Sequence, residues 1–434
     1  MFALADLSPA IGLTLAFAVA LVLGLALKFW LVTRQIRYVA RHRAEVPARF
    51  AGRIALATHQ KAADYTIAKA RLGVLEMALG AVAVLGWTLL GGLDALNQAL
   101  LAVSGAGLLQ QLALLLAFAA ISGLIDLPLS LYRIFALEQR FGFNRMTLRL
   151  WLVDALKGLL LGVLIGLPIA ALILWLMAAA GPLWWLWAWG LWMGLQLLLM
   201  LVYPTFIAPL FNEFRPLQDP ALQAGVSALM QRCGFSAKGL FVMDGSRRSA
   251  HANAYFTGFG AARRVVFHDT LLQQLTPGEV QAVLAHELGH FKHRHITWRI
   301  ALMSALSLAG FALLGWLSGQ MWFYIGLGVR PGIALGPALA AAPNDALALL
   351  LFLLVVPVFT FFMAPLLAQL SRRHEFQADA YAVAQASGAD LSSALLKLYE
   401  GSAATLTPDP VYVQFHYSHP PAAERLARIP AGNG

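Results

Sequence analysis

Two histidines and a glutamate at residues 286–290 form the pattern HExxH, which is typical of zinc-dependent peptidases. His286 and His290 are four residues apart, so on a helix both imidazoles lie on one face and can reach the same ion. Glu287 follows the first histidine, where its carboxylate can act as the general base of a hydrolysis. The alternative is a pair of unrelated surface histidines, and a further ligand elsewhere in the chain would argue against it.

A catalytic zinc commonly has three protein ligands and an open fourth position. One known extension of the motif needs glycine at position 293 and histidine at 296, but the chain has His293 and Ile296. The better candidate is Glu375, with Asp379 four residues later on the same helix face. Glu375 can bind the ion while Asp379 accepts a hydrogen bond from the other ring nitrogen of a ligand histidine. The alternative for this pair is an ordinary charged turn after a membrane helix.

Three other residues of metal-binding type are interpreted as structural. His293 and His295 stand among basic residues, a pattern typical of an exposed helix end, and His295 is expected to face away from His286. Cys233 follows a predicted helix and is expected to be a buried packing residue.

The zinc helix has a clear beginning, because Thr276 is a good N-cap, Pro277 suits the first helical position and Glu279 completes a capping box. The segment before it predicts a small α/β unit with a helix at 219–232 and strands near 239–244, 253–259 and 264–268.

The segment 251–256 is expected to lie beside the zinc helix, where an extended substrate could add to its edge and bond to Asn253. The alternative for Asn253 is a turn residue.

The composition places these elements in a membrane protein. The chain has 434 residues, of which 60% are hydrophobic and only 12% charged, against about 45–50% and about 25% in soluble proteins. This excludes a soluble globule and a disordered chain, and the single cysteine excludes a disulfide-stapled domain. The net charge of +10 is interpreted as topology signals and lipid contacts rather than as a nucleic-acid surface.

Seven apolar stretches are long enough to cross a bilayer, whose core needs about 20 helical residues. They are 10–32, 72–93, 108–132, 158–180, 183–206, 298–328 and 345–370. Basic residues concentrate in 34–71 and 133–157, whereas 94–107 has none. The positive-inside rule therefore predicts an external N-terminus and a catalytic site that faces the cytoplasm.

This topology divides the chain into four parts. They are a membrane region with five helices (1–208), a cytoplasmic zinc-protease insert (209–297), membrane helices six and seven (298–371), and a cytoplasmic C-terminal segment with the third ligand (372–434).

Several polar residues fall at membrane depth, where they can line a wet cavity or make hydrogen bonds between helices. They are Glu76, Gln110, Gln111, Asp126 and Gln196.

Beyond the zinc motif, the chain resembles the type I CAAX prenyl proteases, integral-membrane zinc metalloproteases with an HExxH and a later ExxxD motif. The resemblance spans most of the chain and follows the family's order. It is carried by 137–145 (LEQRFGFNR), 203–212 (YPTFIAPLFN), 246–249 (SRRS), 253–256 (NAYF), 268–272 (HDTLL), 371–379 (SRRHEFQAD) and 418–426 (SHPPAAERL).

The resemblance implies an α-helical integral membrane protein whose seven helices form a barrel around a chamber, with a small cytoplasmic α/β metalloprotease unit. It implies one zinc ion per chain, held by His286, His290 and Glu375, with Glu287 as the base. The family's substrate and transition-state contacts carry over to Asn253, with Tyr255 in the same segment, and to His419 and Arg425.

The expected partners are membrane lipid and a peptide or protein substrate, prenylated or of broader kind, from which a C-terminal tripeptide is removed. No nucleic acid is expected, and nothing in the sequence indicates an oligomer rather than a monomer. The composition and the C-terminal 431–434 (AGNG), which lacks a basic retrieval signal, favour a bacterial inner membrane; in a eukaryote the endoplasmic reticulum would be expected.

Two other functions compete with this one. The first is a quality-control metalloprotease of the heat-shock class, which usually lacks so long an N-terminal membrane half. The second is a catalytically idle transporter or scaffold, which would have no need of Glu287 and a complete ligand set.

Overall fold

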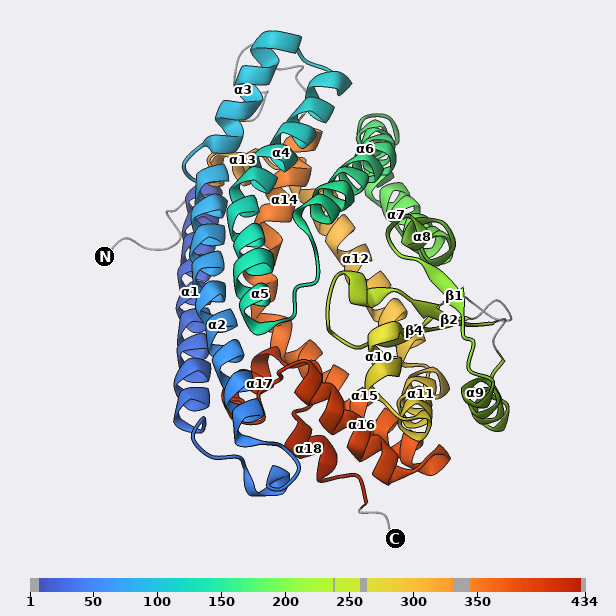
Figure 1. Ribbon diagram of the computed structural model, residues 1–434. Helices are drawn as coiled ribbons and strands as arrows, with labels where there is room; N and C mark the ends of the chain where they lie inside the picture. The colour runs from blue at the N-terminus through green and yellow to red at the C-terminus, as the bar shows by residue number, and fades with distance from the viewer. Residues whose placement is uncertain (1–7, 237–238, 258–263, 331–343, 431–434) are drawn as a thin grey trace.

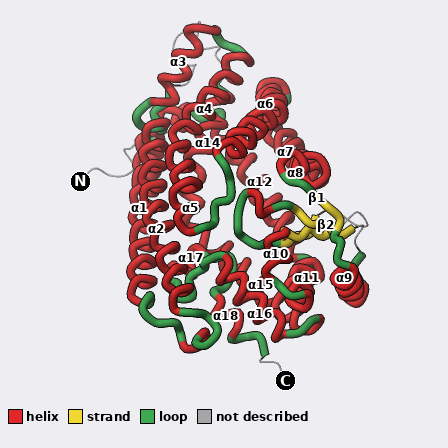
Figure 2. The backbone as a smooth tube through the Cα atoms, viewed as in Figure 1, coloured by secondary structure: helices red, strands yellow, loops and turns green. Residues whose placement is uncertain are grey.

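The computed structural model describes residues 8–236, 239–257, 264–330 and 344–430 (Figure 1). Long helices make up the left and upper parts of the molecule in this view, and a small sheet lies at the right, above α9 and α11. Figure 2 shows that the strands of the described residues all lie at this right-hand side.

The membrane part consists of long helices linked by short ones. In chain order they are α1 (Pro9–Arg41), α2 (Leu56–Trp87), α3 (Gly92–Ser104), α4 (Leu108–Tyr132), α5 (Gln139–Phe141), α6 (Leu148–Ala179), α7 (Trp184–Val202), α8 (Ala208–Phe211), α12 (His295–Leu317), α13 (Met321–Gly326), α14 (Asp345–Thr360) and α15 (Ala364–Gln385). The π-helical turns η3 (Arg133–Glu138) and η5 (Tyr203–Ile207) join α4 to α5 and α7 to α8.

Seven helical stretches in the described chain are long and apolar enough to cross a membrane, which confirms the predicted number. Large apolar side chains such as Leu164 and Trp187 are mostly exposed on their outer faces, as expected where lipid is the solvent. The α14 helix is the exception, because it packs against α1, α4, α6 and α12 and buries most of its first half.

Several helices extend beyond the predicted membrane spans. The α1 and α2 helices have 33 and 32 residues, or about 50 Å at 1.5 Å per residue, so they extend well beyond a bilayer core of about 30 Å. Much of the predicted 34–71 connection is therefore helical. The 94–107 stretch contains most of α3, which Gly91 separates from α2 by a left-handed turn (φ 77°).

The predicted span 298–328 also breaks, since α12 ends at Leu317 and α13 follows. Three of the expected part boundaries, at 208/209, 297/298 and 371/372, fall inside the continuous helices α8, α12 and α15. Hydropathy locates membrane crossings, but it does not report where a helix continues into water.

Of the polar residues at membrane depth, some make hydrogen bonds to other segments and one lines a cavity. Gln110 donates to Asn97 Oδ1 at 2.7 Å, and Gln111 Oε1 accepts from the Ala346 amide at 2.9 Å. Glu76 instead forms an ion pair with Arg133 in the wall of a cavity of about 1060 Å³. Asp126 and Gln196 are exposed.

That cavity lies among α1, α2, η3, α14 and α17 (Pro410–His416). Apolar side chains such as Leu21, Leu25 and Met77 line it, and it extends to His251 and Tyr417. These two residues are each two positions in the sequence from a predicted substrate contact, Asn253 and His419 respectively.

The polar unit is built on a four-stranded sheet with the order β1-β2-β4-β3. Its strands are β1 (Phe214–Pro216), β2 (Gly239–Met243), β3 (Ala254–Thr257) and β4 (Arg264–His268). The β2 and β4 strands are parallel, whereas β3 pairs antiparallel with β4 and forms an edge of the sheet. The three predicted strands are confirmed within the described residues, but the short β1 was missed, and the predicted 258–259 lie outside them.

Helices of the polar unit cover the sheet and complete the site. They are α9 (Pro220–Arg232), α10 (Asp269–Gln274), α11 (Pro277–Lys292), α16 (Gly388–Gly401) and α18 (Ala422–Leu426). Leu229 of α9, Phe267 of β4, and Leu284 and Leu288 of α11 share one fully buried core. The face of α11 opposite the histidines is thereby held on the sheet.

The topology predicts that exposed Ser104 at the end of α3 and exposed Ser227 on α9 lie on opposite sides of the membrane, because three crossings separate them. In a Cys233→Ala background, a membrane-impermeant maleimide added to intact cells should label Ser104→Cys. It should label Ser227→Cys only after permeabilisation. Labelling of both from one side would refute the seven-crossing topology, and the reversed pattern would refute the orientation.

Candidate active site

The α11 helix that carries the HExxH motif is fixed at its N-terminus. Thr276 Oγ1 accepts from the Glu279 amide, and Glu279 Oε2 accepts from the Thr276 amide at 2.7 Å, which confirms the predicted capping box. Glu279 is buried and also accepts from Ser393 at 2.6 Å and Lys397 at 2.7 Å, both on α16. The start of α11 is therefore anchored to the helix beside it.

Close packing of α11 against α15 brings the two halves of the motif together. A Cβ atom at Gly289 would lie 2.9 Å from Ala378 Cα and 3.1 Å from Ala378 O. Real Cβ contacts are essentially never that short with backbone atoms, so only glycine permits this approach. Gly289 precedes His290, and Ala378 stands between Glu375 and Asp379, so this contact limits how far the two histidines lie from Glu375.

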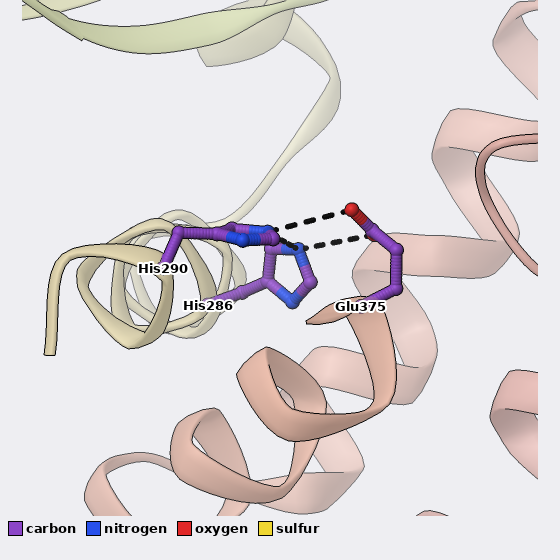
Figure 3. A group of neighbouring side chains, drawn as sticks. All are labelled: His286, His290 and Glu375. Carbon is purple, nitrogen blue, oxygen red and sulfur yellow. Dashed lines mark hydrogen bonds and ion pairs between the residues drawn. The ribbon is translucent and has the colours of Figure 1, made fainter. Parts of the chain in front are cut away.

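Figure 3 shows both imidazoles projecting from α11 toward the Glu375 carboxylate on the neighbouring helix. The Nε2 atoms of His286 and His290 are 3.3 Å apart. His286 Nε2 is 3.5 Å from Glu375 Oε2, and His290 Nε2 is 3.4 Å from Glu375 Oε1. The structure thus brings the three predicted ligands together. Among the described residues, these three form the group that could hold a metal ion.

These distances fit a zinc ion. Ligand atoms about 2.0–2.2 Å from a tetrahedral ion are roughly 3.3–3.6 Å from one another. Glu375 Oε2 is buried and accepts no hydrogen bond from the described residues, an arrangement that a bound cation would complete. Two imidazoles and a carboxylate also form a common donor set for catalytic zinc.

The electrostatics of the site favour positive charge. Burial disfavours protonation of His286, yet the neighbouring carboxylates of Asp379 and Glu375 raise the pKa of its imidazole to about 9. The carboxylates that stabilise an imidazolium there would equally stabilise a divalent cation.

Asp379 lies where the sequence placed it, with Oδ1 2.9 Å from His286 Nδ1. Arg425 holds this carboxylate by two bonds, from Nε to Oδ2 at 2.8 Å and from Nη2 to Oδ1 at 2.5 Å. Arg372 of α15 in turn pairs with Glu424, which fixes the short α18 helix that carries Arg425. The Arg425 guanidinium is buried and forms an ion pair with Asp379, and its Nη1 is 3.8 Å from Glu375 Oε2.

The interpretation that His295 faces away from the motif was wrong. His295 is buried, and its Nδ1 lies 3.0 Å from the Nδ1 of His290. Its Nε2 lies 2.8 Å from Gln377 Oε1 on α15. Helical spacing could not reveal this contact, because the helix breaks at Arg294, which takes a left-handed conformation (φ 56°). His293 is exposed, and Cys233 is buried as expected.

The remaining predicted site residues lie around the open side of this centre. His419 is 65% exposed, and its Nε2 is 3.3 Å from Glu375 Oε1. Glu287 is half-buried on α11 beside His286. Asn253 directly precedes β3, where its carbonyl accepts from the His268 amide, and its Oδ1 accepts from the Ala254 amide. Tyr255 lies within β3, half-buried, with its hydroxyl toward Met243.

A helical membrane bundle that holds two histidines, a glutamate and an adjacent general-base candidate at one end defines the class of membrane-embedded metallopeptidases. Residues 35–213 match the family model described as CAAX prenyl protease N-terminal, five membrane helices. Residues 216–431 match that of peptidase family M48.

Known relatives agree over most of the chain. It is 38% identical over 312 residues to a CAAX prenyl protease 1 homolog of Arabidopsis thaliana, covering 71% of this chain and 70% of that protein. It is 36% identical to CAAX prenyl protease 1 of Saccharomyces cerevisiae, with coverage of 74% and 72%. The crystal structure of S. mikatae Ste24p superposes with a TM-score of 0.87 at 30% identity, over 96% of this chain and 99% of that one.

The chain belongs to peptidase family M48, in the CAAX prenyl protease group. It is therefore a multi-pass membrane metallopeptidase that acts on peptide substrates.

The Gly289 contact generates a prediction. Gly289→Ala should force α11 and α15 apart, weaken metal binding and destabilise the fold by about 1–3 kcal/mol, the usual cost of overpacking. Chelator competition and thermal unfolding of the purified protein measure both effects. Gly158→Ala in α6, where no atom lies within 4 Å of the added methyl, is the matched control. Unchanged metal affinity and stability in Gly289→Ala would mean that this contact does not set the ligand distances.

Proposed function

We propose that this protein hydrolyses peptide bonds with a single zinc ion held by His286, His290 and Glu375. The observation that carries the proposal is the convergence of these three side chains at 3.3–3.5 Å, with Asp379 behind the first histidine. Asp379 orients His286, and Arg425 orients Asp379.

Bound zinc would act as a Lewis acid and lower the pKa of water at its open position. Glu287 takes the proton of the attacking water and delivers it to the leaving amine. His419 is exposed beside Glu375, so its Nε2 can donate to the carbonyl oxygen as negative charge develops there. The sequence predicts Arg425 as a substrate and transition-state contact; its burial against Asp379 supports a positioning role instead.

The substrate would bind as an added strand along β3. This strand is an edge of the sheet, and it packs on α11 through Phe256 and Phe291, whose ring centroids are 5.1 Å apart. Main-chain hydrogen bonds at an edge tolerate many side chains. Asn253 and Tyr255 would contact the peptide there. The position of the peptide's C-terminus would determine which bond lies at the metal, and with it the removal of a C-terminal tripeptide.

A prenyl group would lie in the cavity of about 1060 Å³. Its apolar wall can bury a farnesyl chain, which contributes roughly 0.8 kcal/mol per methylene. The cavity supports prenylated CAAX peptides as substrates, but the chemistry at the metal does not require the lipid. Extended peptides without a prenyl group should therefore also be cleaved.

The N-terminal half argues against the heat-shock class of quality-control proteases, because the family model with five membrane helices matches 35–213. We further propose that the four parts 1–208, 209–297, 298–371 and 372–434 have separate functions, although three of their boundaries fall within helices. The site would face the cytoplasm, as the basic connections indicate, and the composition supports a bacterial inner membrane.

Replacement of the general base should separate chemistry from metal binding. Glu287→Gln should retain zinc and the fold but lose at least about 100-fold in turnover, the usual contribution of general-base catalysis. Peptide cleavage and zinc content are measured on the same purified sample. Glu400→Gln, an exposed glutamate at the end of α16, is the matched control and should cleave normally. Near-normal turnover by Glu287→Gln would rule out its role as base.

Matched peptides should distinguish a dedicated CAAX protease from a broader one. We expect cleavage of a farnesylated CAAX peptide and, with a higher KM, of some unprenylated extended peptides, with both activities lost on metal chelation. The assay compares the peptides with and without the lipid in detergent and in liposomes. Strict dependence on the prenyl group would contradict the broad specificity.

A further inference from the structure

We propose that His295 is a positioning residue for the metal ligand His290, and that Gln377 holds His295 in the orientation this task needs. The inference rests on the proposed zinc site and adds to it a support for the second ligand. The three residues form a hydrogen-bonded chain from α11 through the start of α12 to α15, with lengths of 3.0 Å and 2.8 Å.

The chain has one consistent arrangement of protons. His290 Nε2 faces His286 and Glu375, so it must be unprotonated to bind metal, and the proton of the neutral ring then sits on Nδ1. That Nδ1–H can donate to His295 Nδ1 only if His295 carries its own proton on Nε2. His295 Nε2–H then donates to Gln377 Oε1. The amide oxygen of Gln377 thus selects the tautomer of His295, which selects that of His290.

The two ligand histidines are supported in parallel ways. His286 donates from Nδ1 to Asp379, which Arg425 holds by two bonds. His290 donates from Nδ1 to His295, and a single hydrogen bond to Gln377 holds His295 in turn. Metal-binding histidines usually have such a partner on the second ring nitrogen, and without His295 this position of His290 would have none among the described residues.

The backbone and the packing around His295 are suited to this placement. Arg294 is in the left-handed conformation (φ 56°), which ends α11 and turns the first residue of α12 back toward it. The His295 ring stacks on His374, with centroids 4.0 Å apart and planes at 10°, and the residue is only 6% exposed. Stacking and burial leave the ring little freedom to turn Nδ1 away from His290.

The experiment measures metal binding rather than activity. Zinc affinity of the full-length protein in detergent is determined by chelator competition, and the visible spectrum of the Co²⁺-substituted protein reports ligand geometry. His295→Leu should weaken zinc binding roughly 10–100-fold and change the Co²⁺ bands, the range typical for loss of a support behind a ligand. Asp379→Ala should fall in the same range.

Conservative and control variants separate positioning from general structure. His295→Asn places an acceptor oxygen where Nδ1 lay and should recover most of the affinity and the wild-type spectrum. Gln377→Ala should give a smaller loss of the same kind, and little further loss when combined with His295→Leu, because both act through one chain. His293→Leu removes an exposed neighbouring imidazole and should change neither readout.

Each outcome has a distinct meaning. Failure of the wild-type protein to bind zinc would overturn the proposed function itself. Wild-type affinity and spectrum in His295→Leu, with zinc bound normally by the parent, would overturn only the role of His295. If His295→Leu does not fold, His295→Asn and Gln377→Ala decide: a wild-type result for Gln377→Ala, or no recovery in a folded His295→Asn, would overturn the inference.

Discussion

The approach of α11 to α15 at Gly289 and Ala378 is the contact on which the site depends. The three proposed metal ligands come from two helices that are far apart in the sequence, so the complete set exists only where the helices meet. A methyl group at position 289 would meet the backbone of the other helix at 2.9 Å. The distances of 3.4–3.5 Å from the two histidines to Glu375 thus depend on how closely the two backbones pack.

The surroundings of this contact keep both helices in place. The sheet and α9 pack on the side of α11 away from the histidines, and the buried Glu279 ties its start to α16. The α15 helix continues from the last membrane crossing, so Glu375 is joined rigidly to the barrel. The candidate metal site and the membrane cavity are therefore parts of one framework.

Much of this could be predicted from local patterns, because they lie within single helices. The spacings of His286 with His290 and of Glu375 with Asp379 are periodic signals, and the capping box of α11 is a pattern of neighbouring residues. The positions of His295 and Gly289 could not be predicted in this way. His295 follows a break in the helix and meets Gln377 across 82 residues of sequence, and the need for glycine at 289 exists only when α15 is present.

Composition and charge likewise predicted the number of crossings but not their lengths. The α1 and α2 helices continue far past the apolar stretches, because polar residues support a helix in water as well as apolar ones do in lipid. The sequence also did not decide whether a cavity exists, since a polar residue such as Glu76 could either bond to another helix or line a chamber. The roles of Asn253, Tyr255 and His419 stay predictions.

The most direct test is zinc K-edge X-ray absorption spectroscopy on the purified full-length protein. One zinc ion per chain is expected, with nitrogen and oxygen ligands at roughly 2.0–2.2 Å and the scattering pattern of two imidazoles. Glu375→Ala should lose one light-atom ligand without gaining a protein sulfur. A sulfur ligand near about 2.3 Å, an imidazole count other than two, or no bound zinc would contradict a centre built by α11 and α15.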